Sequence, residues 1–426
     1  MIIHVVQQGE NINTIADRYH IDENRLIQEN GIVNFNNLAV GQTIVIVYPE
    51  QLHTVAEGDT IQSIADQYGI TVIQLLRNNP DILGREFIFP GEILIIRYLD
   101  DKIGEITTNG YVNPYIDINI LQKNLLYLTY LSIYSYAVTE GGDLNDIDDV
   151  HLINLAKAYN VAPIMVISNI TETGYDNEAV HNILSDQNVR NHLIENILSV
   201  LTRKGYYAAN INFPYIQPSD REAFIAFASE IVERLHAEGF RAFFTITPNT
   251  FEPDSEASPE RMDYSILGRI FDVIVLSYFD WAYPTDISTQ MIPYYYIRNL
   301  IEYFTLQIPS EKIMLVGITI GYIWEIPYIE GVTRVNIISN TNAVVLASEE
   351  GAVIQFNRLN LSAYFYTRNQ NLSQVIFYDA RGFDSYINLI AEYGLQGLSL
   401  WNIMYDLRQT FFQLNIKYDI ENHIFN

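Results

Sequence analysis

The stretch "KGYYAANINFPYI", residues 204 to 216, decides how most of this chain is interpreted. Its apolar residues predict a buried β-strand over 207–213. Side chains two positions apart share a face of a strand, so Asn210, Asn212 and Pro214 lie on one side. The predicted strand therefore ends in two amides and a proline, with no ionisable group on that side.

Strand-like and helix-like segments alternate on both sides of that stretch. Eight buried strand-like runs are found at 105–111, 127–136, 163–168, 207–213, 241–247, 272–278, 313–318 and 397–401. Helical patterns separate most of them; the helix after the fourth run has Ser219 or Asp220 as N-cap and stops at Gly239. This order predicts an α/β protein with a (β/α)8 TIM barrel over 103–426. A doubly wound open sheet is the alternative, but no G-x-G-x-x-G motif follows a strand.

A longer segment separates the seventh and eighth runs. Residues 322–379 include "AVVLASEEGAVIQFNRLNLSAYFYT" and "QVIFYDARG", where polar and apolar residues alternate. The pattern predicts a small α+β insertion that walls one side of the barrel mouth.

The first 98 residues contain an internal repeat. "HVVQQGENINTIADRYHI" begins at His4 and "HTVAEGDTIQSIADQYGI" begins at His53, an offset of 49 residues (53 − 4). Each copy has a short strand, a glycine turn, two helical patterns and a last strand. The repeat predicts two βααβ modules, at 1–48 and 51–98.

Composition limits the partners and the chemistry. With 24 Lys and Arg against 51 Asp and Glu, the formal charge of −27 argues against nucleic acid. The absence of cysteine excludes disulfides and thiolate chemistry, and the scattered histidines predict neither a metal site nor a cofactor. No long apolar run predicts a membrane span. The start "MIIHVVQQGENI" has no basic n-region, so we expect synthesis in the cytoplasm without a signal peptide.

The two modules resemble LysM modules, on the pattern H-x-V-x-x-G-D-T-x-x-x-I-A-x-x-Y followed by Asn-Pro. The resemblance implies binding of N-acetylglucosamine-containing glycans such as peptidoglycan or chitin. In the first copy Glu10 and Asn11 replace Asp-Thr, and Gly31 replaces Pro. The same residues also suit helix caps and turns. The implied glycan-binding residues are Gly9, Glu10, Asn11, Ile12, Asn30, Gly31, Ile32, Gly58, Asp59, Thr60, Ile61, Asn79, Pro80, Asp81 and Ile82.

The remaining chain resembles glycoside hydrolase family 18, and within it the spore cortex-lytic N-acetylglucosaminidases that carry two LysM modules. The resemblance rests on "NLLYLTYLSIYSYAVTEGGDL", "YNVAPIMVISN", "SDREAFIAFASEI", "FDVIVLSYFDWAYP", "KIMLVGITIGYIW" and "VIFYDARGFDSYINLIAEYGLQGLSLW". It implies a mechanism in which the substrate's own acetamido oxygen attacks the anomeric carbon. A Glu at the end of the fourth strand protonates the leaving oxygen, and an Asp two residues earlier orients the acetamido group.

That signature, DxxDxDxE, is degenerate here. Its four positions fall on Tyr207, Asn210, Asn212 and Pro214, and a family tyrosine on the sixth strand becomes Phe279. Proline has no ionisable group, and general acid catalysis is worth roughly 10² to 10⁴ in rate. The sequence therefore predicts no catalytic residue among these positions.

Other acids and several aromatic residues follow the predicted strands. Asp280 and Glu325 follow the sixth and seventh strands, and Glu172, Glu252 and Asp406 also lie just past strand ends. Each of the five also fits a solvated loop, and the spacing singles out none of them as a relocated acid. The barrel residues we expect to contact a glycan are Tyr111, Tyr136, Asn212, Asp280, Trp281, Trp324 and Trp401. Large aromatic side chains also fill barrel cores, so both interpretations remain open.

The sequence thus predicts a protein that binds peptidoglycan or another GlcNAc-containing glycan and is catalytically inactive, on the surface of a bacterial spore. One alternative is an active N-acetylglucosaminidase that uses an unusual acid. Another is an assembly scaffold whose partners are spore coat proteins.

Overall fold

The barrel is closed by strands that all run parallel. In the computed structural model the described residues are 1–99, 102–171, 174–247, 262–278, 292–329, 332–368 and 371–423. Within them eight strands pair in chain order, and the eighth pairs with the first to complete the cylinder. The strands are β5 (Gly104–Val112), β6 (Tyr130–Ala137), β7 (Ala162–Ser168), β10 (Ala208–Asn212), β11 (Arg241–Ile246), β12 (Val273–Leu276), β13 (Ile313–Ile318) and β19 (Gly397–Trp401). The predicted TIM barrel is confirmed.

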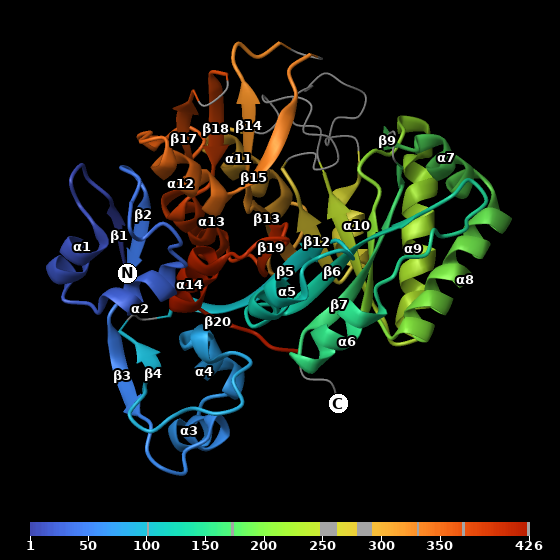
Figure 1. Ribbon diagram of the computed structural model, residues 1–426. Helices are drawn as coiled ribbons and strands as arrows, with labels where there is room; N and C mark the ends of the chain where they lie inside the picture. The colour runs from blue at the N-terminus through green and yellow to red at the C-terminus, as the bar shows by residue number, and fades with distance from the viewer. Residues whose placement is uncertain are drawn as a thin grey trace.

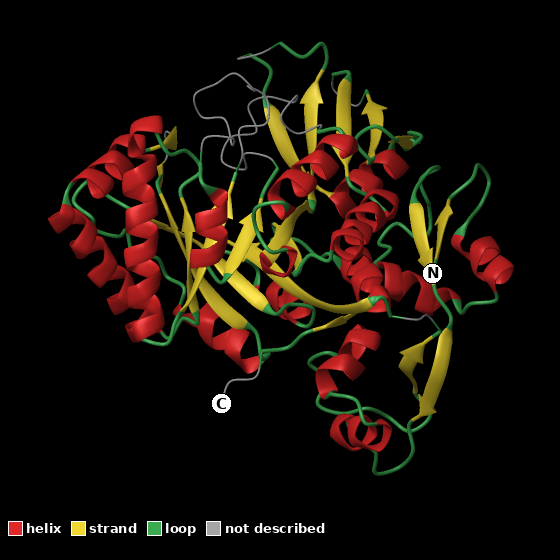
Figure 2. Cartoon of the chain, turned by 180° about the vertical axis from the view of Figure 1, so that it is seen from behind, coloured by secondary structure: helices red, strands yellow, loops and turns green. Residues whose placement is uncertain are grey.

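Helices surround the barrel and bury its outer face (Figures 1 and 2). Leu193, Ile197 and Leu201 are fully buried on α8, as the 3.6-residue period requires. The short strands β8 (Ile170–Thr171) and β9 (Gly174–Tyr175) form a hairpin, and β20 (Tyr418–Ile420) pairs with β5. The helices are α5 (Ile118–Leu125), α6 (Val150–Ala158), α7 (Asn177–Ser185), α8 (Gln187–Lys204), α9 (Arg221–Ala237), α10 (Tyr264–Ile270), α11 (Tyr294–Thr305), α13 (Ala380–Tyr393) and α14 (Arg408–Lys417).

A small α+β subdomain follows β13, as the alternation in that segment predicts. Its antiparallel sheet has the strand order β15-β14-β18-β17-β16. Figure 1 shows this sheet rising above one side of the barrel, with helix α12 beside it. The elements are β14 (Ile320–Glu325), β15 (Val335–Ser339), α12 (Asn340–Glu349), β16 (Gln355–Asn357), β17 (Ser362–Thr367) and β18 (Ser373–Phe377).

The N-terminal repeat forms two βααβ units. Module 1 consists of β1 (Ile2–Val5), α1 (Ile12–Tyr19), α2 (Glu23–Asn30) and β2 (Thr43–Ile46). Module 2 consists of β3 (Pro49–Thr54), α3 (Ile61–Tyr68), α4 (Val72–Asn78), a short 3-10 turn (Pro80–Ile82) and β4 (Ile93–Tyr98). Asn11 and Thr60 cap α1 and α3 through capping boxes, so the repeat is kept in its local hydrogen bonds.

Both modules pack against the barrel domain. Figure 1 shows module 1 beside α14 and the inserted subdomain, with module 2 below it. A shared apolar cluster joins Val45 of module 1, Ile95 of module 2 and Phe412 of α14. Burial of this cluster ties the modules to the barrel.

Candidate functional site

The barrel lumen holds a polar layer in which every hydroxyl and amide is paired. The side-chain amide of Asn109 donates to the Ser399 hydroxyl at 2.8 Å, and the Ser132 hydroxyl donates to the Asn109 carbonyl oxygen at 2.9 Å. All three residues are fully buried. This layer closes the lumen with satisfied hydrogen bonds, as buried polar groups require.

A second layer contains the first asparagine of the degenerate motif. The Asn210 amide donates to the Tyr111 hydroxyl at 3.0 Å, and the Thr245 hydroxyl donates to the Asn210 carbonyl oxygen at 3.0 Å. Burial raises the pKa of Tyr111 to about 12, so its hydroxyl stays protonated. Asn210 is therefore a structural partner of the lumen.

Asn212 lies two residues after Asn210 on β10, and the two side chains differ in their hydrogen bonding. It is 0% exposed, yet neither its amide nitrogen nor its carbonyl oxygen has a hydrogen-bond partner. A buried unpaired amide costs free energy, about 1–3 kcal/mol in proteins. Such a group is a candidate for binding a ligand.

The other two motif positions lie at opposite ends of the strand. Pro214 follows the end of β10 and is partly exposed. Tyr207 precedes β10, and its ring lies 4.4 Å from the ring of His423 and 6.3 Å from that of Tyr130. The N-terminal end of a barrel serves stability, so Tyr207 lies away from the end where barrels carry their chemistry.

Tyr136 does not lie in the barrel mouth, although its place near the end of a predicted strand made it an expected glycan contact. The pairing of β6 with β7 contains a register shift between Ile133 and Tyr136, which turns the following side chains to the other face. The fully buried Tyr136 hydroxyl instead donates to Asp149 at 2.5 Å and accepts from Lys204 at 2.7 Å. This network joins β6 to the surrounding helices.

Trp401 and Trp324, two tryptophans of the expected sugar site, are buried. The Trp401 ring is 8% exposed and lies 5.4 Å from the Tyr111 ring and 5.3 Å from the Tyr134 ring. Trp324, on β14, is 4% exposed and belongs to the main apolar core. The predicted residues Phe279, Asp280 and Trp281 lie outside the described residues.

Two of the candidate acids, Glu325 and Asp406, lie within the described residues. Glu325 is exposed at the end of β14 and accepts a hydrogen bond from the Asn371 amide at 2.8 Å. Asp406 forms an ion pair with Lys123 at 3.1 Å, on the α14 side of the barrel. Neither acid lies on β10 beside Asn212. Glu172 and Glu252 lie outside the described residues.

Asn30 and Asn79, the equivalent asparagines of the two modules, use their side chains for hydrogen bonds within the module. The Asn30 amide donates to Leu26 and Val45 carbonyls and its oxygen accepts from the Val45 amide. Asn79 makes the same three bonds, to Leu75 and Ile95. The sequence predicts both as glycan contacts, but here their side chains join the second helix to the last strand.

The first loops of the two predicted grooves are built alike. The Glu10 carboxylate accepts from the Gln7 amide at 2.8 Å and pairs with His4 at 2.9 Å. Asp59 repeats this with the Ala56 amide at 2.7 Å and His53 at 2.9 Å. The Ala56 amide and the His53 ring lower the pKa of Asp59. The acid therefore shapes the turn in both modules, and the exchange of Asp for Glu at position 10 keeps this bonding.

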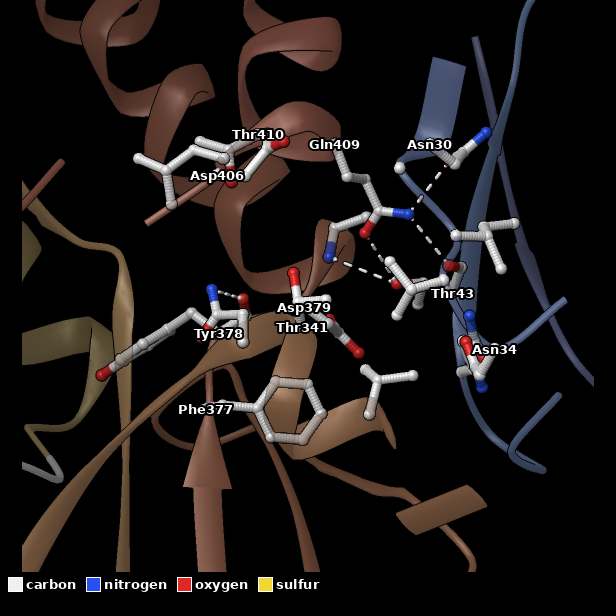
Figure 3. A pocket seen from close by; sticks show the side chains of 18 residues that line it. Asn30, Asn34, Thr43, Thr341, Phe377, Tyr378, Asp379, Asp406, Gln409 and Thr410 are labelled. Carbon is white, nitrogen blue, oxygen red and sulfur yellow. Dashed lines mark hydrogen bonds between the residues drawn. The ribbon is translucent and has the colours of Figure 1, made fainter. Parts of the chain in front are cut away.

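The second loop of the module 1 groove faces the barrel. Figure 3 shows the side chains that line a cleft between Asn30 and Asn34 of module 1 and Thr341, Asp379 and Gln409 of the inserted subdomain and the barrel. The volume of this cleft is about 80 Å³. The Gln409 amide donates to Asn30 at 3.0 Å and to the Thr43 carbonyl at 2.9 Å. A Cβ added at Gly31 would lie 2.8 Å from the Arg408 Cβ. One of the two loops that form the predicted groove of module 1 is thus packed against the barrel.

The residues that the structure describes offer neither a metal-ion site nor a membrane-spanning helix. They contain no group of three or more His, Cys, Asp or Glu side chains placed to hold a metal ion. No helix in the described part of the chain is both long and apolar enough to cross a membrane.

The barrel, its inserted subdomain and the modules define the class. The sequence matches glycosyl hydrolases family 18 over residues 118–406 and the LysM domain over residues 4–47 and 53–97. The chain belongs to glycosyl hydrolase family 18 and carries two LysM domains ahead of the barrel.

Relatives of this chain carry names that refer to cortical fragments or to the spore cortex. The cortical fragment-lytic enzyme of Bacillus subtilis (strain 168) is 32% identical over 435 residues, which covers 100% of both chains. The protein of that name from Bacillus anthracis is 30% identical and covers 94% of each. The crystal structure of the spore cortex-lytic enzyme SleL of Bacillus megaterium QM B1551 matches with a TM-score of 0.81 and 27% identity, over 99% of each chain.

Proposed function

We propose that this protein binds a GlcNAc-containing glycan of the spore, such as peptidoglycan, and does not cleave it. The observation that carries the proposal is the end of β10. The family resemblance places the proton donor at Pro214, which has no ionisable group. The position of the family's orienting carboxylate is Asn212, which is neutral and cannot balance a positive intermediate.

The unpaired amide of Asn212 supports binding. An asparagine side chain offers one carbonyl acceptor and two N–H donors, and a 2-acetamido group offers the complementary acceptor and donor. Both polar atoms of Asn212 are buried without partners in the lumen. A ligand acetamide would satisfy them, which is the energetic reason for keeping an amide there.

The spore is the proposed location because of the relatives. Their names refer to the cortex and to cortical fragments, and each covers nearly the whole of this chain. We propose deposition on the spore surface, with the modules holding the protein on the glycan.

A matched pair of variants tests the role of Asn212 in the full-length protein. N212A is expected to leave the free energy of unfolding unchanged or slightly raised, because it removes an unpaired buried amide. N210A breaks two hydrogen bonds and is expected to destabilise by about 2 kcal/mol. N212A should also weaken binding of chitohexaose measured by calorimetry. If N212A destabilises as much as N210A and binds chitohexaose normally, the proposed role for Asn212 is wrong.

An active N-acetylglucosaminidase is the second candidate, and family membership together with the lytic relatives favours it. The acid would have to be relocated, with Asp280 or Glu325 as the sequence-based choices. Turnover that is lost in D280N or E325Q would establish this candidate.

A further inference from the structure

The turn that precedes the last strand has the same construction in both modules. The Gln42 amide donates to the Ala39 carbonyl at 3.0 Å, and the Glu92 amide donates to the Phe89 carbonyl at 3.0 Å. The third residue of each turn is a glycine, with φ of 88° at Gly41 and 94° at Gly91. Ala39 in module 1 and Phe89 in module 2 are therefore equivalent positions.

In module 1 this turn is covered by the inserted subdomain. Ala39 is 3% exposed and packs with Ala343 and Ala347 of α12. The Asn37 amide donates to the Ser348 carbonyl at 3.0 Å, and the Ile354 amide donates to the Val40 carbonyl at 2.9 Å. The surface that carries this turn is thus an interface in one copy of the repeat.

In module 2 the same surface carries two exposed aromatic rings. Phe87 is 65% exposed and Phe89 is 62% exposed, whereas Ile88 between them is 8% exposed and belongs to the module core. The Ile88 side chain therefore packs into the module core, whereas the rings of Phe87 and Phe89 point outward. Exposed apolar groups that cluster mark interaction sites.

Charged side chains connect these rings to the predicted groove of module 2. Arg85 pairs with the groove residue Asp81 at 3.3 Å and with Glu92 at 3.0 Å. The other oxygen of Glu92 accepts from the Phe89 amide at 3.1 Å. The groove loop and the aromatic pair therefore form one continuous surface, in which Arg85 pairs with both acids and one net negative charge remains. A neutral ligand fits such a surface.

We propose that Phe87 and Phe89 form a stacking platform for pyranose rings and extend the groove of module 2 along a β-1,4-linked GlcNAc chain. This inference rests on the proposed function, since it names the module and residues that hold the glycan. Aromatic rings present large, rigid apolar faces, which match the C–H faces of a pyranose. Module 1 has Asn37 and Ala39 at these positions, so it has no such platform.

Sedimentation of the full-length protein with insoluble chitin tests the platform. F87A/F89A is expected to bind about tenfold more weakly than wild type, as loss of two ring contacts predicts. F87Y/F89Y, which keeps both rings, should retain binding, and F87L/F89L, which keeps apolar area without rings, should lose it. L306A, at an exposed barrel residue, is the matched control and should bind normally.

The outcomes separate this inference from the proposed function. If wild type binds chitin and F87A/F89A binds equally well with an unchanged melting temperature, the platform is wrong and the proposed function stands. If F87L/F89L binds chitin as wild type does, apolar area suffices and the stacking role of the two rings is wrong. If wild type does not bind chitin, the glycan-binding function itself fails, and this inference fails with it.

Discussion

The two N-terminal modules share a fold and differ in what covers them. Asn30 and Asn79 make the same three hydrogen bonds, and the turns at Gly41 and Gly91 have the same conformation. In module 1 the turn is buried under the inserted subdomain. In module 2 it presents exposed phenylalanines. Duplication has thus kept the framework of both copies, while one copy uses its surface for docking and the other leaves it available.

The two modules also contact the rest of the chain through different residues. Module 1 docks through its turn and its second groove loop. Module 2 docks through α4, where Arg77 donates to the carbonyl of Ile420 at 2.9 Å and to the side chain of Asn422 at 2.6 Å. Different anchors leave different surfaces exposed, which explains why only module 2 can offer its turn to a ligand.

The largest effect is expected from the anchor of module 2. R77A removes a guanidinium that is 3% exposed and whose pKa burial lowers to about 10. It leaves backbone carbonyls of the barrel unpaired, so we expect a loss of about 3 kcal/mol in the free energy of unfolding. Urea unfolding of the full-length protein measures it.

R85A is the matched control for that prediction. Arg85 lies in the same module, its side chain is 37% exposed, and its ion pairs are at the surface. Its removal should cost less than about 1 kcal/mol. Equal losses for the two variants would show that module 2 is not anchored through Arg77.

A smaller and sharper contrast comes from the two turn glycines. An added Cβ at Gly41 would lie 2.0 Å from the Ile354 carbonyl oxygen, whereas nothing lies within 4 Å of that position at Gly91. Both substitutions strain a left-handed residue, so G91A should cost about 1 kcal/mol. G41A should cost about 1–3 kcal/mol more, because it also separates module 1 from the subdomain. Thermal unfolding that shifts equally in both variants would contradict the difference in coverage.

The smallest effect concerns the contact between the modules. Burial raises the pKa of Glu29 above its ordinary 4.5, although Arg25 and Tyr98 oppose the shift. A carboxyl group whose pKa is higher in the folded than in the unfolded protein contributes its full stabilisation at pH values below the unfolded-state pKa. This contribution is lost as the pH rises through the folded-state pKa. The stability of E29Q relative to wild type should therefore increase as the pH rises above 4.5. E86Q, at an exposed residue, should show no such trend; a flat difference for E29Q would contradict the shift.

The sequence predicted most of the fold because its periodicities are strong. The fourth barrel strand was expected at 207–213 and is found at Ala208–Asn212, and the eighth was expected and found at Gly397–Trp401. The repeat at an offset of 49 residues (53 − 4) marks two modules of the same construction. Local hydrophobic patterns suffice for these elements, since each is defined by neighbours along the chain.

The site was less predictable because it depends on contacts between distant residues. Tyr136 was expected at the barrel mouth because it lies near a strand end, but a one-residue irregularity in β6 turns its side chain to the other face. Asn30 resembles a ligand contact in the sequence, whereas its bonds to Val45 and Gln409 exist only in the folded chain. The docking of module 1 has no signal in the local sequence, because Asn37 contacts Ser348, which is 311 residues away along the chain.

The central claim is that this chain binds its glycan without cleaving it, and the direct test is the release of reducing ends. The full-length protein is incubated with chitohexaose and with cortex muropeptides, and new reducing ends are measured over time. The account predicts none above the protein-free control, because the family resemblance aligns Pro214 with the acid and Asn212 with the orienting carboxylate. Sustained release of reducing ends that is abolished in D280N or E325Q would contradict it.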